Sequence, residues 1–243
     1  MIQQKIRLFG ILVVGALVAP QAKAVTISIV NGDFETGGLI DNRNSAFPGV
    51  IPTGWSAVPG AGPGGVFYGY YNPINDPGGY ISDVSGNPGV TGTMAGPNVF
   101  YFGSATNGQG IQQALTATFL ANTDYTLTVA RGTRNGDYNN TLRMMLLAGS
   151  TVLTTRDVAP EPAGSRGTFL DYSTIYTYSA ANAGLVGQAL TIRFLEIDNA
   201  VGRTGGEVDI DNVRLVPEPS SASLLMAGIG GLVALQRRRK KTD

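Results

Sequence analysis

The chain contains no cysteine and no histidine among its 243 residues. Disulfides, thiolate metal sites and cysteine nucleophiles are therefore excluded. The absence of histidine also removes Ser-His-Asp triads and histidine-ligated metals. Carboxylates, tyrosine, serine, threonine and arginine remain as the groups that can carry chemistry.

Lysine is missing from residues 25–215, whose nine cations are all arginine. The same stretch holds fifteen acidic residues, which leaves it with a net charge of −6. A nucleic-acid-binding protein needs clustered basic residues that displace counterions from phosphates. We therefore expect no nucleic-acid partner, and a soluble acidic domain outside the cytoplasm.

The first 24 residues have the composition of a secretory signal peptide. Lys5 and Arg7 provide the positive start, and an apolar run follows over residues 8–19. Ala22-Lys23-Ala24 then matches the small-x-small pattern of a cleavage site. We predict that residues 1–24 are removed on export. An N-terminal membrane anchor is the alternative, although the apolar run is short for a span.

Residues 216–243 divide into three consecutive segments. A proline-containing motif at 216–220 precedes a charge-free stretch at 221–236, and a basic cluster at 237–241 ends the chain. As a helix, the charge-free stretch would span roughly 24 Å, which is short of the ~30 Å hydrocarbon core of a bilayer. We therefore predict a transient transmembrane helix. The basic residues that would hold its end in the cytoplasm are Arg237, Arg238, Arg239, Lys240 and Lys241.

This three-part arrangement resembles the PEP-CTERM sorting signal of Gram-negative bacteria. Pro217, Glu218 and Pro219 match its motif, residues 221–236 its transmembrane segment and residues 237–241 its basic tail. The resemblance implies processing by an exosortase, a membrane protease that cleaves near the motif and passes the protein to the cell surface or exterior. It also implies a host that makes exopolysaccharide, and hence a place in the biofilm matrix. A simple C-terminal anchor behind a proline-containing linker is the alternative.

The central part of the chain alternates apolar and polar residues with period two and shows almost no helical periodicity. The clearest strand candidates are 124–130, 141–148 and 189–196. Many strands at short spacing, with no helices between them, predict an all-β antiparallel sandwich or barrel. The further strand candidates are 25–30, 98–103, 110–119, 150–155, 171–179 and 206–215.

A turn signal, Arg134-Asn135-Gly136-Asp137, separates the candidates at 124–131 and 141–148. We interpret it as a hairpin. Arg131, Arg134 and Arg143 gather around it in sequence, and we expect them to neutralise Asp124 and Asp137. Bidentate contacts to an anionic polysaccharide are the alternative.

Residues 48–97 hold thirteen glycines and eight prolines. Because proline lacks a donor and glycine costs backbone entropy, we predict a loop region over one end or side of the sandwich. Its aromatic residues would either stack on sugar rings or hold the loops against the sandwich. These residues are Tyr68, Tyr70, Tyr71 and Tyr80.

Segments 30–35, 51–55 and 208–215 together resemble the galactose-binding-like domains that include many carbohydrate-binding modules. The resemblance implies a jelly-roll β-sandwich over residues 25–215. It also implies a structural calcium held by Glu35 and Asp211. Calcium takes about six to eight oxygen ligands, and the further candidates are Asn31, Asp33 and Asp209. The alternative is that these carboxylates cap turns or pair with Arg214.

The last candidate strand contains a break in its alternation. Val208 and Ile210 share one face of an ideal strand, whereas Val213 and Leu215 fall on the other. One extra residue near 211–212 would restore the register. We therefore predict a β-bulge there, which would also redirect the neighbouring side chains.

These features together predict an exported, non-catalytic protein that binds polysaccharide or builds the extracellular matrix. A self-assembling structural surface protein is the first alternative, and a carbohydrate-active enzyme is the second. A glycosidase needs two carboxylates at a set separation. The glutamates of the domain are Glu35, Glu161, Glu196 and Glu207. They form no recognisable catalytic motif, so we expect no catalytic residues.

Overall fold

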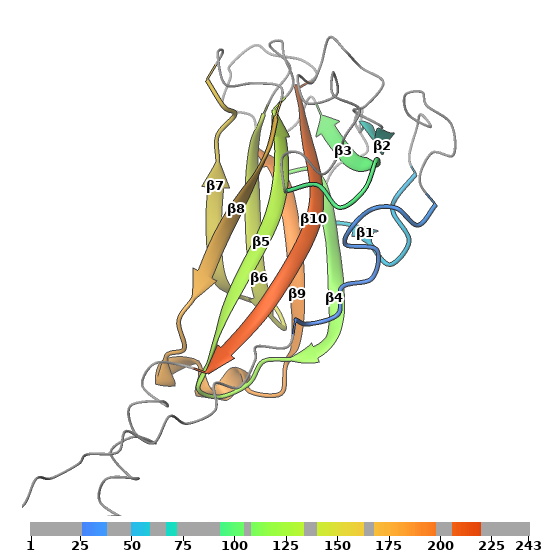
Figure 1. Cartoon of the computed structure of the whole chain (residues 1–243). Coiled ribbons are helices and arrows are strands. Elements are labelled where there is room, and N and C mark those ends of the chain that lie inside the picture. The colour runs from blue at the N-terminus through green and yellow to red at the C-terminus, as the bar shows by residue number, and fades with distance from the viewer. Residues whose placement is uncertain are drawn as a thin grey trace, which may run out of the picture.

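The computed structural model of the chain describes residues 26–37, 50–58, 67–71, 93–104, 108–133, 140–162, 168–197 and 206–219. Within these ranges the chain is almost entirely β-structure (Figure 1). The strands are β1 (Ser56–Ala57), β2 (Phe67–Tyr71), β3 (Val99–Ser104), β4 (Gly110–Thr118), β5 (Thr123–Thr133), β6 (Thr141–Ala148), β7 (Thr151–Val158), β8 (Thr168–Tyr176), β9 (Ala189–Ile197) and β10 (Gly206–Pro219). A short 3₁₀ helix, η3 (Ala180–Leu185), connects β8 to β9.

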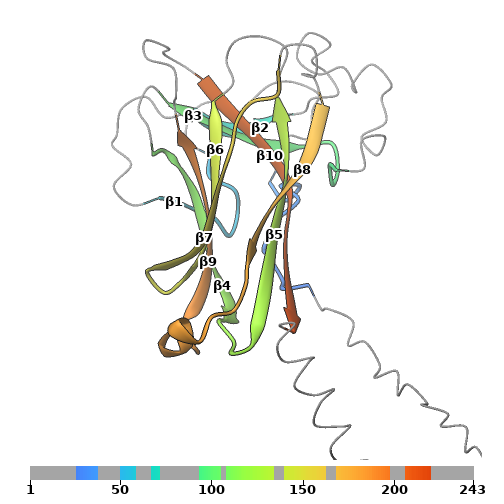
Figure 2. The ribbon, with the colours of Figure 1, turned by 90° about the vertical axis from the view of Figure 1, so that its left-hand side faces the viewer.

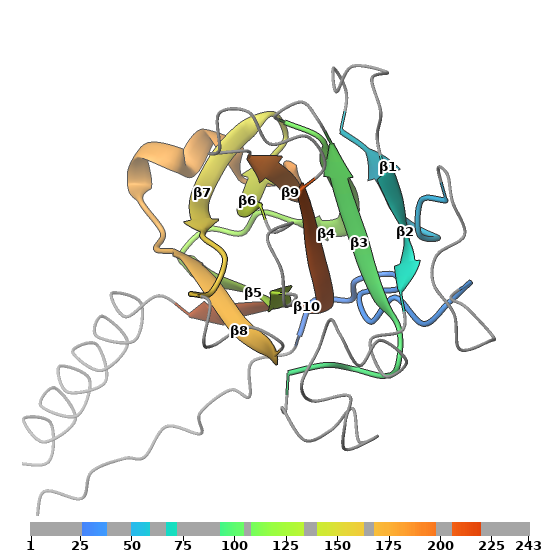
Figure 3. The same cartoon turned by 90° about the horizontal axis from the view of Figure 1, so that it is seen from above.

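The strands form two antiparallel five-stranded sheets. The first sheet has the order β1-β4-β9-β6-β7, and the second has the order β2-β3-β10-β5-β8. Seen from above, the two sheets surround a common interior (Figure 3). This is the jelly-roll sandwich that the period-two pattern and the family resemblance predict, so the fold prediction is confirmed.

The core lies between the two sheets, where alternate residues of each strand meet. The inward residues of β4, β6, β9 and β10 are buried and mostly apolar, as the alternation in sequence predicts, with Gln113 and Glu196 as buried polar exceptions. Phe34 and Trp55 extend this core from the N-terminal segment, with ring centroids 5.6 Å apart. Large aromatic rings bury much apolar area, which compensates for the short strands β1 and β2.

The edge strands β7 and β8 close one side of the sandwich (Figures 1 and 3). The hydroxyls of Thr154 on β7 and Thr174 on β8 lie 2.8 Å apart, and the Nη1 group of Arg156 donates to the carbonyl of Ser173 at 2.5 Å. These contacts link the two edge strands across this side of the sandwich.

The predicted β-bulge is confirmed. The pairing of β10 with β5 shifts register between Asp211 and Arg214, and Asn212 takes a left-handed backbone conformation with φ of 48°. Asparagine tolerates this conformation better than most residues. The bulge places Val213 and Leu215 in the core beside Val208 and Ile210.

Two local predictions are wrong. Residues 25–30 form no strand in the part that the structure describes, because only Ile27 makes a bridge, to Leu215, before the chain turns at Asn31 and Gly32. The stretches 124–131 and 141–148 form no hairpin, because β5 and β6 lie in different sheets. The turn residues 134–137 themselves lie outside the described residues.

Candidate active site

A second apolar cluster lies on the outer face of the second sheet. Its buried members are Val99, Tyr101, Ala130 and Phe169, with Met94 partly buried against them. Phe100 and Phe102 belong to the main core, and strand alternation therefore directs Val99 and Tyr101 to the opposite face. The outer face of an antiparallel sandwich is usually solvated. A buried cluster there needs a covering structure and suggests a function.

Asp209 belongs to this outer face, because it stands between the core residues Val208 and Ile210 on β10. Its side chain is only 2 % exposed. Aspartate is rarely buried to this extent unless it is partnered or used. Asp209 is therefore a buried acid on the face of the sheet that also carries Tyr101.

One row of residues crosses four strands through Asp209. Tyr101 on β3 stands opposite Asp209, Asp209 stands opposite Gly132 on β5, and Gly132 stands opposite Phe169 on β8. Neighbouring strands are about 4.8 Å apart, so the backbones that carry the two rings are separated by roughly 14 Å. Glycine inside a strand often marks the close approach of a ligand. The row has an aromatic residue at each end, with an acid and a residue without a side chain between them.

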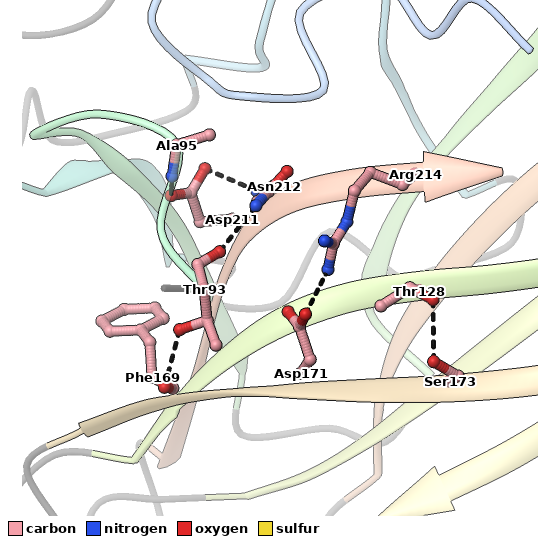
Figure 4. Close-up of polar contacts among 9 residues, drawn as sticks. All are labelled: Thr93, Ala95, Thr128, Phe169, Asp171, Ser173, Asp211, Asn212 and Arg214. Atoms are coloured by element: carbon pink, nitrogen blue, oxygen red, sulfur yellow. Dashed lines mark hydrogen bonds and ion pairs between the residues drawn. The ribbon is translucent and has the colours of Figure 1, made fainter. Parts of the chain in front are cut away.

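The next row along the same face carries two further carboxylates, those of Asp211 and Asp171 (Figure 4). Asp211 stands opposite Ala130, and Ala130 stands opposite Asp171. The carboxylate of Asp171 pairs with Arg214 at 2.6 Å. Ala130 has a small side chain, so little rises from the face of the sheet next to Gly132. The Asp171–Arg214 ion pair lies at the polar edge of this area.

Residues 93–95 cross this face as a strap, fastened by three hydrogen bonds (Figure 4). The Thr93 hydroxyl donates to the Phe169 carbonyl at 2.7 Å. The Asn212 side-chain amide donates to the Thr93 carbonyl at 2.8 Å, and the Ala95 N–H donates to the Asp211 carboxylate at 2.7 Å. The strap carries Met94 onto the apolar cluster. The bulge therefore directs the Asn212 side chain toward the strap.

The Asp211 carboxyl group is fully buried, and burial raises its pKa from 3.8 to about 8. The N–H groups of Ala95 and Asn212 donate to it and act in the opposite direction, while the negative charges of Glu35 and Asp33 raise the pKa further. Glu35 is half-buried, and burial likewise raises its pKa. Asn98 opposes that shift, because its backbone and side-chain N–H groups donate to the two oxygens of Glu35 at 2.8 and 2.6 Å.

The negative charge of Glu35 contributes to the raised pKa of Asp211, so the structure couples the two carboxyl groups electrostatically. Arg214 pairs with Asp171 instead of these carboxylates. Asn31 and Asp33 line a neighbouring cleft of about 560 Å³, together with Ala95 and Asn212. In the parts of the chain that the structure describes, no three acidic side chains gather in a metal-binding arrangement. Calcium therefore stays a prediction, with Glu35 and Asp211 as its main ligands and Asn31, Asp33 and Asp209 as the further candidates.

The predicted aromatic platform is not formed by the tyrosines whose side chains the structure describes. Tyr70 belongs to the core at 2 % exposure, and its hydroxyl donates to the Thr36 carbonyl at 2.9 Å. Tyr68 is partly buried and packs against the same core. Tyr71 pairs with Val99 through the backbone, but its side chain and all of Tyr80 lie outside the described residues.

Arg131 does not pair with Asp124 as predicted, and belongs instead to a buried polar network that includes Asn140 and Glu196. Arg131 is 1 % exposed and lies between the sheets, where it donates to the Thr133 hydroxyl at 2.8 Å and the Asn140 carbonyl at 2.7 Å. The Asn140 side-chain amide in turn donates to the buried Glu196 carboxylate. Continuing the alternation of Leu127 and Val129 by one step would have placed Arg131 inward. Asp124, its expected partner, instead accepts the N–H of Tyr178.

Two family models match the chain, and together they cover almost all of it beyond the first 24 residues. The model described as HpiC1 cyclase, HpiC1-like, matches residues 25–216. The chain belongs to the HpiC1-like family. A PEP-CTERM protein-sorting motif matches residues 215–240. The HpiC1-like match includes residues from every strand of both sheets, whereas the sorting motif begins only at the end of β10.

Solved structures agree with this membership. The Stig cyclase Fisc from Fischerella sp. TAU, in complex with (3Z)-3-(1-methyl-2-pyrrolidinylidene)-3H-indole, is 26 % identical with a TM-score of 0.62; the match covers 82 % of this chain and 100 % of that one. An apo form cyclase from Fischerella sp. is 25 % identical with a TM-score of 0.64, over 82 % and 98 %. A cyclase from Fischerella sp. TAU in complex with 4-(1H-indol-3-yl)butan-2-one is 26 % identical with a TM-score of 0.63, over 82 % and 100 %. A comparison with curated proteins found no match.

These findings correct the functional prediction. The expectation of a non-catalytic glycan-binding or structural protein is wrong, because the HpiC1-like family and the similar solved structures are cyclases. The expectation that the protein is not an enzyme fails for the same reason. The error arose because binding modules and cyclases share the jelly-roll framework, which says nothing by itself about chemistry.

The sorting prediction is confirmed. The PEP-CTERM motif implies processing by an exosortase and export through the membrane to the cell surface. The predicted transmembrane helix at 221–236 and the basic cluster at 237–241 lie outside the described residues. Among the residues that are described, no helix has the length and apolarity to span a membrane.

Proposed function

We propose that the outer-face site of the second sheet is the active site of an exported cyclase, with Asp209 as its proton donor. Its substrate would be a planar, largely apolar aromatic molecule that carries a carbon–carbon double bond. The observation that carries this proposal is the row Tyr101, Asp209, Gly132 and Phe169, which combines a buried acid with aromatic residues on both sides. An indole is the aromatic group we favour, because two similar cyclases are described with indole ligands.

The chemistry that this arrangement supports is an isomerisation. Asp209 gives a proton to the double bond of the substrate, which leaves a cationic carbon. An electron-rich ring carbon of the same molecule then forms the new carbon–carbon bond, and loss of one proton from the ring restores a neutral product. Atoms and electrons balance within the substrate, since one proton enters and one leaves. Aromatic faces beside the acid stabilise the passing positive charge, as they do in other cation–π contacts.

The small residues Gly132 and Ala130 give the site its shape. A flat ring system can lie over them only where no side chain rises from the sheet. Tyr101 and Phe169 then bound the ligand at its two ends, and Met94 on the strap covers it. Asp211 and Asn212 act as positioning residues in this scheme, because they hold the strap rather than touch the substrate.

The sorting signal implies that this enzyme acts outside the cytoplasm. In our proposal the tail at 221–236 anchors the precursor transiently in the inner membrane, and an exosortase then removes it. A calcium ion at Glu35 and Asp211 would stabilise the fold close to the strap. It would neutralise a cluster in which the charges of Asp33 and Glu35 raise the pKa of Asp211.

The test compares the mature protein with its Asp209→Asn variant. Binding of 4-(1H-indol-3-yl)butan-2-one is measured by calorimetry, and turnover is measured as conversion of an indole-bearing alkene to a cyclic isomer of unchanged mass. We expect the variant to bind the probe within a fewfold of the unsubstituted protein and to lose about 10²- to 10⁴-fold in turnover, the usual contribution of a general acid. The exposed Asp157→Asn on β7 serves as the control with unchanged turnover. Full activity in Asp209→Asn would refute the assignment.

A further inference from the structure

The sorting motif is part of the folded sheet. β10 continues to Pro219 and stays paired with β5 to its end, with Pro217 opposite Tyr125, Glu218 opposite Asp124 and Pro219 opposite Thr123. The end of β10 reaches the lower end of the sandwich close to the start of β5 (Figure 2). The three residues that the exosortase must recognise are therefore already bound, as the last residues of a β-strand.

The direction of the backbone groups in this segment follows from one hydrogen bond. The Leu215 carbonyl accepts from the N–H of Ile27 at 2.9 Å, on the side of β10 away from β5. Because backbone groups of an antiparallel strand alternate between its two sides, Pro217 and Pro219 also turn away from β5. Val216 and Glu218 turn toward it. Proline has no N–H, so it fits the side of a strand where no partner needs one.

This alternation leaves the outward side of the motif without backbone hydrogen-bond donors at positions 217 and 219. Proteins that bind an extended peptide usually add it to a sheet edge through backbone hydrogen bonds. The outward positions 217 and 219 offer carbonyls but no donors, and the N–H groups of Val216 and Glu218 are directed to β5. A second protein can form a backbone ladder with the motif only after β5 has released it.

We propose that the exosortase competes with β5 for the motif, so that residues 216–219 leave the sheet before the sorting signal is bound. The partner is thus a protein that takes an extended strand. The last four residues of β10 act as a detachable end, while the rest of the strand remains in the sandwich.

Two features make this end detachable and limit how far it opens. Glu218 and Asp124 are directly opposite one another, and like charges in that relation destabilise a strand pair. Glu218 and Pro219 are exposed, and Val216 and Pro217 are only half-buried. From Leu215 upward, β10 is different, because Leu215 is fully buried and bridged to Ile27. Opening is therefore expected to stop at Leu215.

The chain has no cysteine, which allows a clean cross-linking test. A Thr126→Cys and Val216→Cys pair would lock β10 to β5 directly before Pro217, Glu218 and Pro219 without altering these three residues. Opposed residues of a hydrogen-bonded pair lie about 5.5 Å apart between Cα atoms, which a disulfide can bridge. The matched control is the Thr128→Cys and Arg214→Cys pair, which lies higher on the same two strands and leaves residues 215–219 free.

Processing of the full-length precursor is followed in the exosortase-bearing host by immunoblot and intact mass, with and without reductant. Disulfide formation is checked on non-reducing gels. We expect the oxidised 126–216 lock to slow removal of the tail at least tenfold, with recovery on reduction, while the 128–214 lock is processed like the unsubstituted chain. Normal processing of the oxidised 126–216 lock would overturn the proposal. Equal slowing by both locks would overturn it too, because opening would then have to extend beyond Leu215.

A second variant avoids the disulfide altogether. Asp124→Asn removes the like charge opposite Glu218 but keeps an oxygen that accepts the N–H of Tyr178. A better-paired strand end should be processed about twofold more slowly in the same assay. Faster or unchanged processing would count against competition with β5. Neither readout depends on cyclase activity, so the proposed function and this inference can fail separately.

Discussion

Asp209 and Tyr101 stand directly opposite one another on β10 and β3, and both are almost completely buried on the outer face of the sandwich. The pair joins an acid to an aromatic ring at a place where antiparallel sheets usually meet water. Gly132 stands opposite Asp209 on its other side and adds no side chain beside the pair.

Filling the position of Gly132 should close the site. The Gly132→Val variant suits a strand and raises a branched side chain beside Asp209. We expect the affinity for 4-(1H-indol-3-yl)butan-2-one to fall at least tenfold, because the ring can no longer lie on the sheet. Calorimetry measures the affinity, and a thermal melt shows whether the fold is retained. A folded variant with unchanged affinity would place the ligand elsewhere.

Loosening the strap should affect binding more than folding. Asn212→Gly keeps the left-handed backbone but removes the side-chain hydrogen bond to Thr93. One such bond contributes about 0.5–1.5 kcal/mol, so we expect a small drop in Tm and a severalfold rise in KM with kcat less affected. Asn122→Gly is the matched control, because Asn122 has φ of 53° in an exposed turn away from the strap. Equal effects in the two variants would mean that the strap plays no part in binding.

The raised pKa of Asp211 predicts how stability depends on pH in the presence of a chelator. The unfolded chain loses this proton near pH 3.8, whereas the folded chain keeps it to about pH 8. The free energy of unfolding should therefore fall as the pH rises between these values, and become level above them, since the unfolded state binds fewer protons over that range. Urea melts from pH 5 to 9 measure the fall, which Asp211→Asn should reduce.

Calcium would reverse this trend, because a cation beside Asp211 favours the ionised carboxylate. Added calcium should then raise the Tm most at pH 8 and above, and Glu35→Gln should weaken the effect. If calcium leaves the Tm unchanged at every pH while the chelated protein shows the predicted fall, the calcium prediction is wrong and the carboxylate pair is metal-free.

Several elements were predictable because their signals are local. A strand that faces a core alternates its residues with period two, so the strands around 124–130, 141–148 and 189–196 could be predicted from their own residues. The bulge followed from the same rule, since Val213 and Leu215 could join the core only if one residue was added before them. The sorting signal lies in consecutive residues and needs no fold to be recognised.

The hairpin prediction shows what local signals cannot predict, which is the sheet that each strand joins. The turn residues between β5 and β6 indicated a break between two strands, but not that the chain crosses from one sheet to the other. A turn motif describes four residues, whereas the choice of sheet depends on which strands pair afterwards. The misplaced Arg131 has the same origin, because an inward arginine is tolerable only where carbonyls such as that of Asn140 meet it.

By itself, the sequence determined that this chain is exported, carries a sorting signal and folds as an antiparallel sandwich with a bulge near residue 212. Only the tertiary structure decided that Tyr101, Asp209, Gly132 and Phe169 form one row, that Asp211 holds Ala95 across 116 positions of sequence, and that the sorting motif is paired with β5. The physical reason is register. Alternation along a strand says which face a residue occupies, but its cross-strand neighbours depend on how separate strands align when they pack around a common core.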